Sequence, residues 1–192
     1  MVKHKILRAD LHVHSKYSDR PSEWILKALG TRESYTEPEE IYRICKKNGM
    51  DIVTITDHNS IEGALILKRN HPEDVILGSE LTTYFPENGC KIHCLVYGFT
   101  EEQFLEMDKL RKNIYELREY IKVNDIVHSV AHATYSINNK LQYEQLERLI
   151  LLFDSFEVIN GARNSKNNLI WGKSLANLGP EHIERLQAKH ND

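Results

Sequence analysis

The chain has 192 residues, of which 41% are hydrophobic and 28% are charged, and its formal net charge is −3. This size and composition predict one soluble domain, 1–192, with a core of its own. No run of about 18 apolar residues occurs, which excludes a membrane-spanning helix, and the negative charge disfavours a dedicated nucleic-acid binder. The start lacks the apolar region of a secretory signal and cysteines are few, so a cytoplasmic location is expected.

Strand and helix patterns alternate along nearly the whole chain. A strand is predicted at 5–14, and a helix follows the capping pattern Thr36-x-x-Glu39, with Pro38 in its first turn and Gly49 at its end. The later predicted elements are strand 51–56, helix 60–69, strands 75–83 and 90–99, helix 101–122, strand 126–133, helix 143–153, strand 155–161 and a largely helical segment from 167, broken near Gly179. This alternation is typical of an α/β fold of parallel strands, whose ligands bind at the carboxyl ends of the strands.

Polar residues stand at the ends of the first two predicted strands. Side chains alternate along a strand, so Asp10, His12 and His14 share one face, where two imidazoles could hold a metal ion or simply be solvated. Asp57 and His58 close the next strand, either as an active-site loop or as an ordinary turn in which Asp57 caps a helix. Asp10 and Asp57 are the candidate carboxylates for orienting metal-bound histidines.

Three further strand ends carry candidate ligands. Glu80 ends an apolar run and is either a solvated edge residue or a carboxylate that bridges two ions. Alternation places His93 on the opposite face from Cys90 and Cys94, so both cysteines are predicted to pack as small apolar residues. His132 lies near the end of a fifth strand. Five successive strand ends therefore carry histidines or acids, more than random placement would give.

Several phrases carry a resemblance to the PHP family, named for polymerase and histidinol phosphatase. They are DLHVHSKYSD at 10–19, VTITDHNSIEGA at 53–64 and AHA at 131–133, with Glu80 and His93 between them. The chain resembles these metal-dependent phosphoesterases over essentially its whole length. The resemblance implies a distorted (β/α)7 TIM-like barrel that binds up to three divalent metal ions, zinc, manganese or iron.

The resemblance also implies a role for each candidate residue. The implied ligands are His12 and His14 for the first metal, Glu80 as the bridge to the second, His93 and His132 for the second, and Asp19 and His58 for the third. Asp19, His58 and Glu80 would lie closest to the reaction, in which a hydroxide that bridges two metals attacks phosphorus. Arg20 and Arg163 could bind phosphate through their guanidinium groups, the alternative being two solvated arginines.

The sequence departs from the family at its end. The family's last metal motif, an Asp-x-His near the C-terminus, has no counterpart after His132. We therefore expect a barrel that lacks its last strand, a C-terminally truncated domain, and incomplete first and third metal sites.

The expected substrate is a small phosphorylated metabolite or a nucleotide. Nucleic acid is not favoured as a partner, no membrane is expected, and the sequence does not predict an oligomeric state. Two alternatives stay open. One is an amidohydrolase-type metal hydrolase, which also begins with His-x-His on its first strand. The other is a non-catalytic metal-binding or regulatory remnant of a PHP enzyme.

Overall fold

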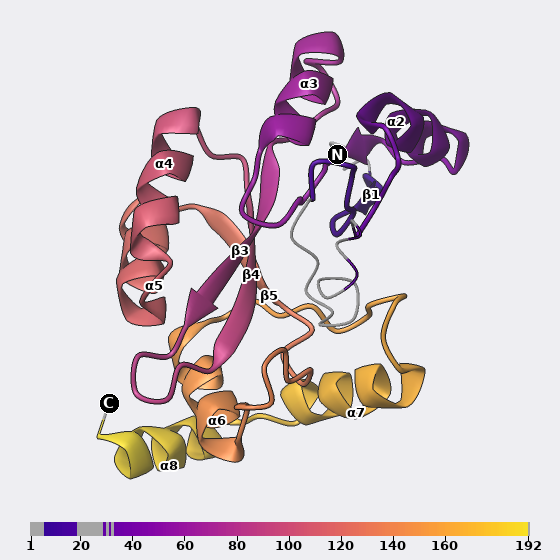
Figure 1. The fold of residues 1–192 in the computed structure, drawn as a ribbon. Helices are drawn as coiled ribbons and strands as arrows, with labels where there is room; N and C mark the ends of the chain where they lie inside the picture. Colours follow the sequence, from indigo (N-terminus) through magenta and orange to yellow (C-terminus); the bar gives the residue numbers. More distant parts are fainter. Residues whose placement is uncertain (1–5, 19–28, 30, 32, 192) are drawn as a thin grey trace, which may run out of the picture. The chain divides into compact units, whose positions relative to one another are not determined.

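The structure is a computed structural model that describes residues 6–18, 29, 31 and 33–191. Helices and strands are mixed along it, with strict alternation only in the first half of the chain, and this confirms the predicted α/β class (Figure 1). The described elements are, in chain order, β1 (Ala9–Asp10), α2 (Pro38–Lys47), β2 (Ile52–Val53), α3 (Glu62–Asn70), β3 (Gly78–Tyr84), β4 (Lys91–Tyr97), α4 (Glu101–Leu110), α5 (Ile114–Val123), β5 (Val127–Ala131), α6 (Tyr143–Leu152), α7 (Ser165–Ala176) and α8 (Pro180–His190). None of these described helices is both long and apolar enough to cross a membrane.

The chain divides into two compact units, which are described separately below. Unit 1 comprises Met1–Leu81 and Leu95–Asp108, and unit 2 comprises Thr82–Cys94 and Lys109–Asp192. The strands β3 and β4 each pass from one unit into the other. Neither unit is therefore one continuous stretch of chain.

The strands form two small sheets. β1 pairs in parallel with β2, and a three-stranded sheet has the order β3–β4–β5. In unit 1, parallel bridges join Val53 to Val75 and His58 to Glu80, so the residues that follow β2 lie beside the start of β3. The described strands do not close into a barrel. The predicted (β/α)7 barrel therefore stays a prediction.

Unit 1 has a core between α2, α3 and β2. Its buried members are Ile41, Cys45, Val53, Ile55, Ala64, Leu67 and Val75. Pro38 suits the first turn of α2, where its missing N–H is not needed, and Gly49 follows the helix with φ +78°. The predicted capping box of Thr36 is not formed, because Glu37 is the N-cap residue and its side chain makes no capping hydrogen bond.

The predicted helix 101–122 is in fact two helices. α4 ends at Leu110 and α5 begins at Ile114, after Asn113, whose side chain accepts a hydrogen bond of 3.0 Å from the backbone N–H of Tyr115. An asparagine side chain that caps the next helix competes with continuation of the previous one. The apolar stripe that suggested one helix is buried on both helices, since Met107 and Ile114 are both inaccessible to solvent.

In unit 2, the predicted strand 155–161 is reduced to a single parallel bridge between Val130 of β5 and Phe156. The backbone N–H of Val130 donates to the oxygen of Ser155 at 3.0 Å, and the N–H of Glu157 donates to the oxygen of Val130 at 2.9 Å. These bonds hold Glu157 beside the end of β5. Elsewhere in the unit, α6 and α8 lie against each other (Figure 1).

Candidate functional site

Three histidine side chains of unit 1 converge on one carboxylate oxygen. Oε2 of Glu80 lies 3.2 Å from Nε2 of His12 and 3.1 Å from Nε2 of His14. The same oxygen lies 3.0 Å from Nδ1 of His58. Glu80 and His58 are buried, whereas His12 and His14 each keep a partly exposed edge. We call these four residues the His–Glu cluster.

Hydrogen bonds between neighbouring segments position the cluster. The strand predicted at 5–14 is regular only at Ala9–Asp10, and Val13 bonds instead to Thr56, both through its N–H to the threonine hydroxyl (3.0 Å) and through its oxygen to the threonine N–H (2.8 Å). On the other side, the N–H of Glu80 donates to the oxygen of Asp57 at 3.2 Å. The histidine-bearing segments are thus fixed beside the start of β3.

Gly78 allows β3 to approach so closely. A Cβ atom at this position would lie 2.4 Å from the Thr54 hydroxyl oxygen and 3.0 Å from the Ile55 oxygen. The Thr54 hydroxyl would have to move and the Ile55 backbone is already tightly approached, so a residue with a side chain would disturb the packing of β3 here. Glu80 follows only two residues later, and its place in the cluster depends on this contact.

Asp57 is buried and fixes the loop that follows His14. Its carboxylate accepts hydrogen bonds from the N–H and the hydroxyl of Ser15, both at 2.6 Å. Burial raises the pKa of Asp57 above its ordinary value, and these bonds from Ser15 only partly offset the effect. The hydrogen bonds recorded for the Asp57 carboxylate go to Ser15. Asp10 is exposed, and its carboxylate accepts a long bond of 3.4 Å from the N–H of His12.

Two residues that the sequence did not indicate, Ser18 and Glu33, lie behind the rings of His14 and His58. The Ser18 hydroxyl oxygen lies 3.2 Å from Nδ1 of His14 and 3.3 Å from Oε2 of Glu33. The same Glu33 oxygen lies 2.9 Å from Nε2 of His58. Glu33 belongs to an irregular stretch without a strand or helix pattern, and no signal of spacing could have identified it.

The carboxylates around His58 shift its pKa and that of Glu33. Burial lowers the pKa of His58, but the charges of Glu80 and Glu33 outweigh burial, so the pKa lies above its ordinary value. Burial likewise raises the pKa of Glu33, yet its hydrogen bond to His58 and the nearby imidazoles bring the pKa below its ordinary value. The cluster therefore favours charge on Glu33 and positive charge on His58.

The geometry and chemistry of the cluster fit a divalent metal ion. The groups of His14, His58 and Glu80 can offer ligand atoms that all lie within 4.8 Å of one another. Ligand atoms about 2.0–2.1 Å from a tetrahedral zinc ion lie roughly 3.3 Å apart, close to the separations found around Glu80. Imidazole and carboxylate ligands also suit manganese and iron.

Unit 2 brings together the other two predicted histidines. The buried rings of His93 and His132 lie 5.3 Å apart between centroids and nearly perpendicular to each other. His132 has a φ of +29°, a conformation that few residues other than glycine adopt. Its N–H donates to Oε2 of Glu157 at 2.8 Å, and the Asn160 amide donates to the same carboxylate at 3.0 and 3.1 Å. Glu157, which the sequence did not indicate, thus holds the strained backbone of His132.

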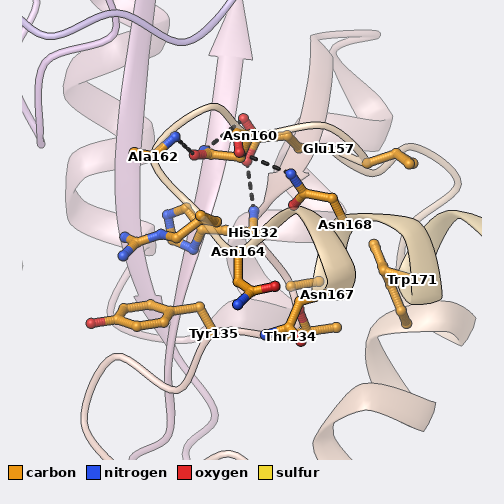
Figure 2. A pocket seen from close by; sticks show the side chains of 13 residues that line it. His132, Thr134, Tyr135, Glu157, Asn160, Ala162, Asn164, Asn167, Asn168 and Trp171 are labelled. Carbon is orange, nitrogen blue, oxygen red and sulfur yellow. Dashed lines mark hydrogen bonds between the residues drawn. The ribbon is translucent and has the colours of Figure 1, made fainter.

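A cavity of about 310 Å³ opens beside His132 in unit 2 (Figure 2). Both polar and apolar groups line it, and the lining residues are His132, Ala133, Thr134, Tyr135, Glu157, Val158, Asn160, Ala162, Arg163, Asn164, Asn167, Asn168 and Trp171. The guanidinium carbon of Arg163 lies 3.8 Å from the centroid of the Tyr135 ring, a stacked arrangement. Arg163 is therefore held at this cavity, and its role in binding phosphate stays a prediction.

Two predicted site residues, Asp19 and Arg20, lie outside the described residues. The cysteines were predicted to stay outside the site. Cys90 and Cys94 are buried free thiols, like Cys45, and burial raises the pKa of the Cys90 thiol to about 11. Among the described residues, the groups that could hold a metal ion contain no cysteine. The prediction that the cysteines pack as apolar residues is confirmed.

Comparison with known proteins finds solved structures with the same fold, but it does not show a family. No protein-family model matches the chain. Over 80 residues, 40% of the chain, the sequence is 41% identical to an uncharacterized protein of Methanocaldococcus jannaschii, of which the match covers 45%. The chain therefore spans less than half the length of that curated relative.

Two solved structures share the fold. One is a candidate metal-dependent phosphoesterase from Bifidobacterium adolescentis, with a TM-score of 0.55 and 15% identity over 97% of this chain and 85% of that one. The other is an amidohydrolase from Chromobacterium violaceum with bound sulfate and no metal, with a TM-score of 0.61 and 12% identity over 86% and 82% of the two chains. At these identities the likeness shows a common fold rather than a common reaction.

Proposed function

We propose that this protein is a metal-dependent hydrolase that acts on phosphate esters, of the PHP type and with its barrel fold. The observation that carries the proposal is the convergence of His12, His14 and His58 on the buried carboxylate of Glu80. A buried carboxylate that faces three imidazoles is a costly arrangement unless a ligand uses it. Support for hydrolysis comes from the two similar folds, one described as a phosphoesterase and one as an amidohydrolase.

In this proposal the residues of the His–Glu cluster bind and orient, and the ion supplies the reactivity. The chemistry that a divalent ion adds is polarisation of phosphoryl oxygens and a lower pKa of water, about 7 with zinc. The buried Glu80 and His58 fix the inner side of the cluster. The partly exposed edges of His12 and His14 leave its outer side open to a substrate. His93 and His132 offer two further imidazole ligands within unit 2.

The proposed substrate is a small phosphorylated metabolite or nucleotide. The cavity of unit 2 has the size of the smaller ligand pockets of proteins, about 300–1,000 Å³. Its amide side chains can bond hydroxyl or carbonyl groups, and Arg163 carries the planar fork that suits phosphate oxygens. Asp19 and Arg20 are proposed as a further metal ligand and a further phosphate contact, on the resemblance alone.

A second candidate function is amide hydrolysis, which the likeness to the amidohydrolase fold favours. Both reactions use a polarised carbonyl or phosphoryl oxygen, and the His–Glu cluster alone does not choose between them. Arg163, which lines the cavity of unit 2, suits an anionic group of a substrate, and this favours the phosphate ester.

The test combines metal analysis with a choice of substrates. The purified protein is loaded with zinc, manganese or iron(II), and hydrolysis of p-nitrophenyl phosphate is compared with that of p-nitrophenyl amides. We expect bound metal, turnover of the phosphate ester, and loss of both in Glu80→Gln. The loss should exceed the roughly 10–100-fold effect of removing an outer hydrogen-bond partner.

His71→Ala is the matched control. His71 also lies in unit 1 and bonds to a glutamate, but it stacks on Tyr42 with a centroid distance of 3.6 Å, away from the cluster. This variant should keep both metal and activity. Amide hydrolysis without phosphate ester hydrolysis would establish the second candidate instead, and bound metal with no turnover would indicate a non-catalytic remnant.

A further inference from the structure

We propose that Glu33, together with Ser18, is a positioning pair that orients His58 and His14 so that one chosen nitrogen of each ring binds the metal. This inference rests on the proposed metal site and deepens it. Glu33 lies in an irregular stretch, and neither the sequence patterns nor the resemblance assigned it a role. Its position in the structure is what points to one.

The two rings each direct one nitrogen toward Glu80 and the other toward this pair. His58 places Nδ1 3.0 Å from Glu80 and Nε2 2.9 Å from Glu33. His14 places Nε2 3.1 Å from Glu80 and Nδ1 3.2 Å from the Ser18 hydroxyl. The nitrogens next to Glu80 are those that face the common centre. The nitrogens on the far side are those that an orienting partner should contact.

A metal-bound histidine needs one ring nitrogen for the metal and the other for a hydrogen-bond partner. A neutral imidazole carries one N–H donor and one lone pair, and the partner of the N–H decides which nitrogen is left for the metal. A carboxylate is the strongest neutral-pH acceptor for such an N–H. With a metal ion on the side of Glu80, Glu33 would therefore hold the form of His58 in which Nε2 carries the hydrogen and Nδ1 keeps its lone pair for the ion.

Ser18 extends the same function to His14. Its hydroxyl oxygen is within 3.3 Å of Glu33 and accepts a bond of 3.2 Å from the backbone N–H of His58. Ser18 is fully buried, so its hydroxyl cannot turn to water. One carboxylate thus fixes the ring of His58 directly and is linked through one hydroxyl to the ring of His14.

The position of Glu33 argues against a simple surface ion pair. Its side chain is 22% exposed, and the side chain of His58 is 3% exposed. Glu37, four residues later in the same part of the chain, shows the contrast, because its partner Lys16 is a surface lysine and its own side chain is 60% exposed. An exposed pair of that kind contributes little, about 0–1 kcal/mol.

The test reads the ring nitrogens of His58 directly, without using activity. Long-range ¹H–¹⁵N spectra of the wild-type protein are recorded with zinc, and without metal at alkaline pH, where the ring is neutral. With zinc bound, we expect the hydrogen on Nε2 and zinc on Nδ1, and the metal-free spectra serve as the reference. Zinc on Nε2, or a zinc-loaded ring whose hydrogen is on Nδ1, would overturn the assignment.

Two variants of Glu33 separate orientation from direct metal binding. Glu33→Ala should mix the two ring forms of His58 and weaken zinc binding about 10–100-fold, measured by competition with a chelator. Glu33→Gln keeps an oxygen that accepts from Nε2–H, so it should keep the ring form and lose less affinity. Equal losses in both variants would show Glu33 to be a direct ligand and reject the positioning role.

Glu37→Ala is the control, and it should leave the ring form of His58 and the zinc affinity unchanged. Unchanged zinc affinity and ring form in Glu33→Ala would also reject the proposal. If only the proposed function is wrong, the result differs from these outcomes. The wild-type protein then shows the expected ring form and binds zinc but hydrolyses no phosphate ester. Should Glu33→Ala not fold, the wild-type spectra and Glu33→Gln still decide the question.

Discussion

At the scale of single residues, the sequence indicated His12, His14, His58 and Glu80 because each was expected at the end of a predicted strand. In the structure Glu80 lies near the start of β3 and not at a strand end. The cluster forms because the segment that follows β2 lies beside the start of β3, where a parallel bridge joins His58 to Glu80. Glu33 had no such signal, because no strand or helix pattern in the sequence marks it.

Gly63 packs against Asp57 and Ser15, and we predict that a side chain at this position destabilises the protein. A Cβ atom there would lie 2.6 Å from Oδ2 of Asp57 and 2.6 Å from the Ser15 hydroxyl, so Gly63→Ala must displace the bond between them. Helix propensity favours alanine in α3 by about 1 kcal/mol. Overpacking costs about 1–3 kcal/mol and a lost bond to a charged group about 1.5–3 kcal/mol. Both exceed the gain in helix propensity, so Gly63→Ala should lower the free energy of unfolding.

Denaturant unfolding measures the effect of Gly63→Ala, and zinc affinity should fall with stability because the loop after His14 moves. Gly161→Ala is the control, since a Cβ atom at that position meets no atom within 4 Å. We expect its free energy of unfolding to stay within about 0.5 kcal/mol of the wild type. A Gly63→Ala protein that is more stable than the wild type would contradict this account of the loop.

At the scale of elements, the sequence predicted the type of each element better than its ends. The helix predicted at 101–122 failed at Asn113, because an apolar stripe continues across a turn as easily as along one helix. The first and last predicted strands were too long for a different reason. Val13 bonds to the side chain as well as the backbone of Thr56, and Phe156 makes only one bridge, and no residue pattern records such partners.

The contact between α6 and α8 should depend on pH. Glu147 of α6 accepts bonds from Lys189 (2.7 and 2.8 Å) and lies 2.9 Å from Nε2 of His190. The bond from Lys189 lowers the pKa of Glu147, although burial opposes it. A lowered pKa adds stability above the unfolded pKa of about 4.3, and this stability disappears as the pH falls through the folded value.

Glu147→Gln should therefore be less stable than the wild type near neutral pH, by up to about 1 kcal/mol because the pair is partly exposed. The difference should shrink as the pH falls below about 4. Urea unfolding at several pH values measures it. Glu184→Gln changes an exposed glutamate of α8 that makes no ion pair among the described residues, and it should show no such difference. A difference for Glu147→Gln that persists in acid would reject the electrostatic explanation.

At the scale of the whole molecule, the alternation of strands and helices was enough to predict an α/β fold. The composition showed no linker, and the reason is visible in the structure. The chain passes between its two units inside β3, β4 and α4, so the crossings lie within regular elements rather than in a segment with the composition of a linker. The barrel was predicted from the resemblance alone. The described strands form two small sheets that do not close into a barrel, so the barrel stays a prediction.

Metal binding should stabilise the whole protein. A ligand that binds only the folded state adds about 2.7 kcal/mol at a free concentration of 100 times its Kd. Zinc or manganese should therefore raise the melting temperature, and a chelator should reverse the rise. Glu80→Gln should melt at one temperature with and without metal. An equal rise in this variant would place the bound ion elsewhere than the His–Glu cluster.

The route of the chain through β3 and β4 also governs how the protein can be dissected. Each unit is assembled from two separated stretches, and Leu95–Asp108 completes the first only after the second has begun. A stop codon or a single protease cut therefore cannot release either half intact. Testing one half alone requires a gene in which the two separated stretches of that half are joined directly to each other.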